Sequence, residues 1–240
     1  RKNSPSAKKQ LATLITNYEK AKAENCTAEI KAICDEQLSH TKDSIIALYI
    51  SGILGLKQGN LDNSNLVTLV DIFQKNYKEP VVTYLCETIL DIDPNNKFAL
   101  RTLADIYRAA NDPKAWALYE KIVKIDVEEA EIAKILSEHY EAEGDVKNAV
   151  AYCKKALLRF VYANNMTALK ETWAKLVSMI PDEIDFFLLV QRKVEKSISA
   201  EKSALLLHDL YPYYKDNAPS DPKKWDIAIQ ILKIILRIDP

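Results

Sequence analysis

Two stretches in the middle of the chain decide its fold: Leu100-RTLADIYRAANDPKAWALYEKIVKI-Asp126 and Ala133-KILSEHYEAEGDVKNAVAYCKKA-Leu157. The first begins with apolar residues at i, i+3, i+4 and i+7, which is the spacing of one face of an α-helix: Leu100, Leu103, Ala104 and Tyr107. A short polar turn and a second segment of helical spacing follow in both stretches. Each stretch therefore predicts a hairpin of two helices.

The two hairpins are copies of one unit. Tyr107 and Tyr140 lie 33 residues apart, with Gly144, Ala149, Cys153 and Ala156 following in the second copy, and Ala115, Tyr119 and Ile122 in the first. These offsets fit the tetratricopeptide pattern, in which about 34 residues form two antiparallel helices. The ending Ile89-LDID-Pro94 recurs as Ile122-VKI-Asp126 and as Ile235-LRID-Pro240. Outside 80–160 the repeat is irregular, so degenerate tetratricopeptide units and generic hairpin stacking both stay open, and both give an α-solenoid.

Composition supports a helical chain. The 240 residues include only four glycines, with 48% hydrophobic and 28% charged residues, which disfavours folds rich in hairpin turns or phosphate-binding loops. The predicted fold is all-α, a right-handed superhelix of tetratricopeptide-like hairpins with about thirteen helices. Residues 1–10 are expected to form a flexible tail and 11–240 the solenoid, truncated at its C-terminal end. A longer loop is expected over Tyr211 to Pro222.

Several classes of function are disfavoured by the sequence. The 33 basic and 34 acidic residues give a net charge of −1, so neither nucleic acid nor a membrane surface is an expected partner. The longest apolar stretch, 45–56, is too short to span a bilayer. No nucleophile motif, zinc spacing or cysteine pair stands out, so we expect no enzyme activity, catalytic residue, cofactor or metal. Cys86 and Cys153 are predicted to be buried packing residues.

Helical repeats usually bind protein partners on a concave surface. The first-helix positions expected to face this groove are Phe98, Arg101, Asp105 and Arg108 in one repeat, and Glu131, Lys134, Glu138 and Glu141 in the next. Repeats that bind a C-terminal carboxylate generally pair Lys with Asn at the Arg101/Asp105 and Lys134/Glu138 positions. Here acids replace the Asn, so that mode is disfavoured. The alternative, solvated helix faces with i,i+4 charge pairs, stays open.

Six segments carry a resemblance to a known family. They are Ser44-IIALYISGI-Leu54, Val82-TYLCETI-Leu90, Lys97-FALRTLADIY-Arg108, Val123-KIDVEEAEI-Ala133, Phe186-FLLVQRKVEKSISAEKSALLL-His208 and Trp225-DIAIQILKIIL-Arg237. They resemble the helical extension that precedes the Gre module in long bacterial transcription elongation factors of the Gre family. The resemblance covers nearly the whole chain from about residue 30, in packing segments rather than catalytic motifs.

The resemblance implies a function for the parent protein: rescue of stalled RNA polymerase by stimulated transcript cleavage, with the chemistry in the polymerase. No catalytic or metal-holding residue of the family can be assigned to this sequence. The chain is then expected to be a non-catalytic, cytoplasmic scaffold whose partner is RNA polymerase or another transcription protein. The alternative is a generic tetratricopeptide adaptor, or a spacer or dimerisation module, unrelated to transcription.

Overall fold

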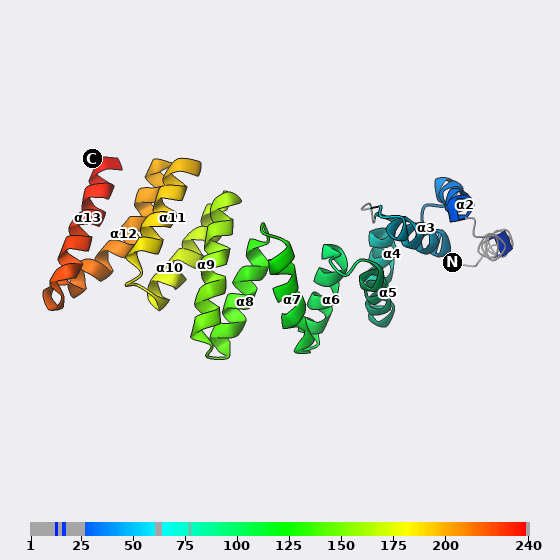
Figure 1. Ribbon diagram of the computed structural model, residues 1–240, viewed down its shortest axis with the longest axis horizontal. Helices are drawn as coiled ribbons and strands as arrows, with labels where there is room; N and C mark the ends of the chain where they lie inside the picture. The colour runs from blue at the N-terminus through cyan, green and yellow to red at the C-terminus, as the bar shows by residue number, and fades with distance from the viewer. Residues whose placement is uncertain (1–12, 14–15, 18–26, 61–63, 77, 239–240) are drawn as a thin grey trace. The chain divides into compact units, whose positions relative to one another are not determined.

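The structure, a computed structural model, describes residues 13, 16–17, 27–60, 64–76 and 78–238 (Figure 1). Within these ranges the chain forms twelve α-helices with defined bounds and one short 3₁₀ helix, with no β-strand. The all-α class and the hairpin organisation predicted from the sequence are confirmed. The expected tail, 1–10, and Cys26 lie outside the described residues, and the extent of one continuous solenoid over 11–240 stays a prediction.

The chain divides into two compact units, 1–118 and 119–240. The first unit contains α2 (Thr27–His40), α3 (Ile45–Lys57), α4 (Ser64–Lys75), α5 (Glu79–Ile92), α6 (Lys97–Ala109) and the start of α7 (Lys114–Ile125). From α2 to α6 each helix packs on the next, and α3 also contacts α5. This pattern of neighbouring contacts is the one expected of stacked hairpins.

The second unit holds the rest of α7, followed by α8 (Ala130–Ala142), α9 (Val146–Tyr162), α10 (Met166–Met179), α11 (Ile184–Ser197), α12 (Ala200–Asn217), the 3₁₀ helix η1 (Ala218–Ser220) and α13 (Pro222–Ile238). Here α9 packs on α8, α10 and α11, while α12 packs on α10, α11 and α13 (Figure 1). Buried Ala149, Cys153 and Ala156 let α9 approach α8 closely, and the Ser137 hydroxyl donates to the Ala149 carbonyl oxygen at 2.9 Å.

The repeat found in the sequence recurs in the turns. Asn111, after α6, and Gly144, after α8, both have left-handed backbone, with φ of 55° and 77°. They lie 33 residues apart, so the same position of the hairpin takes the same strained conformation in each copy. Asparagine and glycine are the residues that tolerate this region best, which explains the choice at both positions.

A hydrogen bond also recurs with the repeat. In the first unit the Tyr107 hydroxyl donates to the Glu87 carboxylate at 3.4 Å. In the second, the Tyr140 hydroxyl donates to the Glu120 carboxylate at 2.5 Å. Both partners shift by 33 residues from one copy to the next. Each bond ties the first helix of a hairpin to the helix that precedes it.

In the first unit, α3 and α4 meet at a glycine. A Cβ atom built on Gly52 would lie 2.5 Å from Cγ of Leu66, which is fully buried on α4. One turn later, a Cβ on Gly55 would meet only atoms at 3.8 Å, an ordinary contact. Close helix packing therefore requires glycine at Gly52 and not at Gly55.

The buried cysteines behave as packing residues. Cys86 and Cys153 are almost fully buried on α5 and α9, as predicted. Burial raises the pKa of the Cys86 thiol to about 12 and raises that of Cys153 as well. Because the thiolate is the reactive form, both side chains are held in their inert state.

The prediction of a long loop over Tyr211 to Pro222 is wrong. Helix α12 continues to Asn217 with Pro212 inside it, and only the 3₁₀ helix Ala218–Ser220 and Asp221 separate it from α13, which begins at Pro222. Tertiary contacts hold the helix past its proline. The Tyr214 hydroxyl donates to the Pro181 carbonyl oxygen at 2.7 Å, and the Tyr213 hydroxyl donates to the Asp182 carboxylate at 2.9 Å. Proline usually breaks a helix, but here contacts with residues distant in the sequence keep the segment helical.

The two glycines of α3 provide a matched test of this packing. We expect Gly52→Ala to lower the free energy of unfolding by about 1–3 kcal/mol, because the added methyl group overlaps Leu66. Gly55→Ala, in the same helix, should instead raise it by up to about 1 kcal/mol through better helix propensity. Urea denaturation followed by circular dichroism measures both. Equal effects of the two substitutions would contradict the close contact at Gly52.

The recurring tyrosine bond predicts a dependence on pH. The hydrogen bond to Glu120 raises the pKa of Tyr140 above its usual value, so its contribution is present below about pH 10 and is lost as the pH rises through the raised pKa. Tyr140→Phe should cost about 2 kcal/mol near neutral pH, the range for bonds to a charged group. The difference from the unsubstituted chain should shrink at higher pH.

Thermal stability is measured as a function of pH, and the control variant is Tyr84→Phe, since the Tyr84 side chain is 62% exposed on α5. We expect it to leave thermal stability unchanged across the same pH range. A Tyr140→Phe difference that stays constant up to strongly alkaline pH would show that the hydroxyl does not stabilise the fold through Glu120.

Candidate functional site

The residues predicted to line a groove lie on the first helix of each hairpin. In the first unit Arg101, Asp105 and Arg108 are exposed along one face of α6, while Phe98 is half-buried and packs against the core below them. The spacing i, i+3, i+7, i+10 keeps the four on one side of the helix. The sequence thus placed a charged surface with one apolar anchor on α6 correctly, and its use as a groove stays a prediction.

In the second unit the corresponding face lies on α8. Glu131, Glu138 and Glu141 are exposed and Lys134 is half-buried. Two of these side chains form ion pairs with α10: Lys134 with Glu171 at 2.9 Å, and Glu141 with Lys175 at 2.5 Å. The hydrogen bond to Glu171 raises the pKa of Lys134, so its positive charge is secure at neutral pH.

These ion pairs differ from the i,i+4 pairs considered for this face. The partners lie on α10, the first helix of the next hairpin. The sequence reasoning missed Glu171 and Lys175, although Lys175 lies 34 residues after Glu141, one repeat further on. Extending the repeat register into the irregular region would have found this pair. The pairs leave Glu131 and Glu138 as the exposed acids of the face.

A stripe of apolar side chains is exposed on the last helix, α13. Its members are 38% to 54% exposed and follow the a/d spacing of a heptad: Trp225, Ile229, Leu232 and Leu236. An adjacent side of the helix, with Ala228, Ile231 and Ile235, is buried on the rest of the unit. This helix is therefore apolar on two sides, and one of them is exposed.

The described residues were compared with the patterns of a metal site and of a membrane-spanning helix. Within the described ranges no three His, Cys, Asp or Glu side chains gather as a ligand set. None of the helices in those ranges combines the length and apolar character that crossing a bilayer requires. The three histidines of the chain, His40, His139 and His208, lie on α2, α8 and α12.

Comparisons with solved structures add little to this picture. One neighbour is BtubC (BKLC) from P. vanneervenii, with 16% identity, a TM-score of 0.39 and coverage of 89% of each chain. Another is the C-terminal part of a TPR repeat-containing protein from Cytophaga hutchinsonii, with 14% identity, a TM-score of 0.41 and coverage of 92% of this chain and 94% of that one. These scores are too low to carry an argument, so the fold assignment depends on the hairpins themselves.

Sequence comparison is more informative. No family model matches the chain. It is 42% identical over 219 residues, 91% of this chain, to the Putative GreA-associated domains protein of Treponema pallidum. It is 35% identical over 234 residues, 96% of this chain, to the Transcription elongation factor GreA of Borreliella burgdorferi.

Both relatives are much longer proteins. The chain spans 32% of the length of the first and 25% of the second. Neither name is that of an enzyme. The family resemblance carried by the packing segments of the sequence is confirmed by these matches. The chain is a Gre-related helical domain, homologous to a segment of these long proteins named for GreA.

Proposed function

We propose that this chain is a non-catalytic protein-interaction scaffold of a Gre-type transcription elongation factor. The observation that carries the proposal is the homology to two GreA-named proteins over more than nine tenths of the chain. The architecture supports it, because stacked hairpins bind partners through extended helix faces. Under this proposal the protein acts in the cytoplasm, with RNA polymerase as its first expected partner.

The proposed role separates recruitment from chemistry. Rescue of stalled polymerase by stimulated transcript cleavage would be the activity of the whole factor, with catalysis in the polymerase. The helical domain would hold or orient the factor. The exposed charged faces of α6 and α8 are the proposed contact surfaces. On α8, Glu131 and Glu138 are the acids that the ion pairs to α10 leave available.

A binding experiment tests the proposal directly. Residues 1–240 are immobilised and incubated with purified RNA polymerase from the same bacterium, and the retained subunits are quantified. We expect retention, and we expect Glu131→Lys with Glu138→Lys to weaken it about tenfold, since reversing charges on a contact surface opposes association.

The matched control is Asp209→Lys with Asp216→Lys. These two acids are exposed on α12 with the same spacing of seven residues, and their reversal changes the net charge equally. The control should retain polymerase like the unsubstituted chain. If purified polymerase is not retained at all, the polymerase is not the partner. If both double variants weaken retention equally, α8 is not the contact surface.

A second candidate function is self-association, which the apolar stripe on α13 favours. An exposed a/d stripe can pair with the same stripe of a second copy. We expect a concentration-dependent mass in sedimentation velocity if this is the role, lost in Leu232→Glu and kept in Leu205→Glu. Leu205 is the matched control because it is 47% exposed on α12. A constant monomer mass at all concentrations would exclude this candidate.

A further inference from the structure

A basic cavity lies between the end of α9 and the C-terminal half of α11. It has a volume of about 450 Å³ and is lined by Tyr162 of α9 and by Leu189, Arg192, Lys193, Lys196 and Ser197 of α11. Arg192 and Lys196 are separated by one helical turn, so both side chains project on the same side of α11. We call these six residues the α11 basic cavity.

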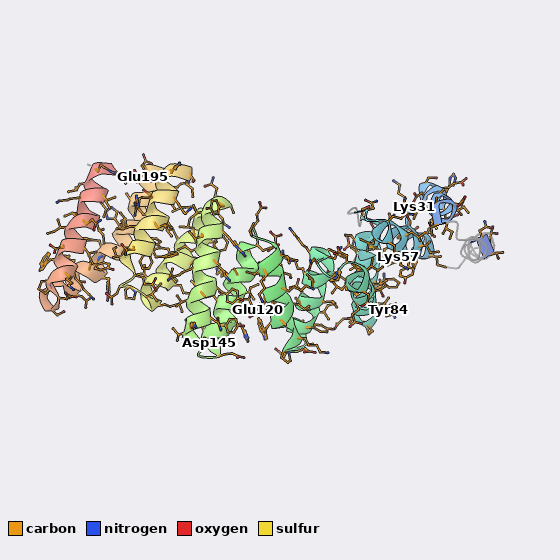
Figure 2. The ribbon with its side chains drawn as sticks, in the orientation of Figure 1. Lys31, Lys57, Tyr84, Glu120, Asp145 and Glu195 are labelled. Carbon is orange, nitrogen blue, oxygen red and sulfur yellow. The ribbon has the colours of Figure 1, made fainter. Side chains whose placement is uncertain are left out.

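The cations of this cavity lack partners of opposite charge. In the described part of the chain no carboxylate forms an ion pair with Arg192, Lys193 or Lys196, although other cations of the second unit do have such partners. Glu195 lies among these cations in the sequence, but it forms its ion pair with a residue of another helix, α13. Arg237 of α13 donates to both of its carboxylate oxygens, at 2.8 and 3.0 Å. Figure 2 labels Glu195 on α11.

The three cations therefore form a concentrated positive charge that no ion pair among the described residues compensates. Three cations within five residues repel one another, which costs stability unless an anion compensates them. Arg192 has only one fixed contact, from Nε to the Leu188 carbonyl oxygen at 3.2 Å. The two terminal nitrogens of its guanidinium group are therefore available for a planar, bidentate contact with a carboxylate.

The cavity also has an apolar side. Tyr162 is 72% exposed and Leu189 is 43% exposed. Lys193 fixes the tyrosine: its Nζ donates to the Tyr162 hydroxyl at 3.0 Å and lies 5.3 Å from the ring centroid. The tyrosine is thereby held at the edge of the cavity. There its ring and the Leu189 side chain form an apolar surface next to the cations.

We propose that the α11 basic cavity binds an acidic polypeptide segment in which carboxylates flank an apolar side chain. The carboxylates pair with Arg192 and Lys196, and the apolar side chain packs on Leu189 and the Tyr162 ring. This surface lies on different helices from the α6 and α8 faces. The proposal therefore does not depend on the identity of the partner that binds those faces.

A protein ligand fits this site better than a nucleic acid. Binding a phosphate backbone depends on several cations along an extended track, and three cations on one helix can neutralise only a few phosphates. The whole chain has a net charge of −1, which provides no general attraction for a polyanion. The exposed Leu189 gains nothing from a phosphate, whereas it can bury area against an aliphatic side chain.

The test uses a short fluorescein-labelled peptide with two carboxylates on each side of a leucine, and fluorescence anisotropy with residues 1–240. We expect saturable binding that weakens as the salt concentration rises, because exposed charges are screened. Arg192→Glu with Lys196→Glu should weaken binding about tenfold or more. Leu189→Ser should weaken it by a smaller factor with little change in the salt dependence.

Controls separate the site from net charge and from folding. Lys147→Glu with Lys223→Glu makes the same charge change at exposed positions near the starts of α9 and α13. On each of these helices, the substituted position lies about 20 Å from the helix end that is nearer the cavity. This variant should therefore bind like the unsubstituted chain. A peptide with amides in place of the carboxylates should not bind. Circular dichroism checks that each variant keeps its helical content.

Three results would overturn the proposal. The first is no binding of the acidic peptide at millimolar protein concentration. The second is equal binding by the cavity variant and the control variant. The third is a single-stranded RNA oligonucleotide that binds more tightly than the peptide and is lost in the same cavity variant, which would make the cavity a nucleic-acid contact.

Discussion

The described helices of this protein each have an apolar stripe that they cannot bury alone and that packs against a neighbouring helix, while α13 has a second stripe that is exposed. On α9 small side chains at Ala149, Cys153 and Ala156 bring the backbone close to α8. On α3 the absence of a side chain at Gly52 does the same for α4. Every other feature follows from this constraint, because stacked helices leave their remaining faces in water. Those faces carry the charges from which a binding function can be built.

The sequence predicted the fold well where local signals and packing agree. Helical spacing, the Tyr107 and Tyr140 correspondence and the turn residues all indicated the same hairpin, and the structure has it. Prediction failed at Tyr211 to Pro222, where a proline and several tyrosines suggested a loop. The contacts that keep this segment helical come from Pro181 and Asp182, which lie about 30 residues earlier, so no local pattern could reveal them.

The candidate surfaces were only partly predictable. Of the eight predicted groove positions on α6 and α8, six are exposed and Phe98 and Lys134 are partly buried, and their use as a binding surface stays a prediction. Their partners on α10 and the cavity beside α11 were not predicted. Counting charges in the sequence sets Glu195 against Arg192, Lys193 and Lys196, a net charge of +2. Only the structure shows that Glu195 turns to Arg237 and leaves the cations uncompensated.

The left-handed turn residues make the repeat exchangeable. Asn111 and Gly144 occupy equivalent places, and each is followed by an aspartate, Asp112 and Asp145. A deletion of 112–144 would join Asn111 directly to Asp145 and rebuild a turn of the same kind. Removal or duplication at these points changes the chain by one whole hairpin without shifting the register of any helix. A gene built this way can lengthen or shorten its product by whole hairpins. Each new junction already has residues suited to the left-handed conformation of the turn.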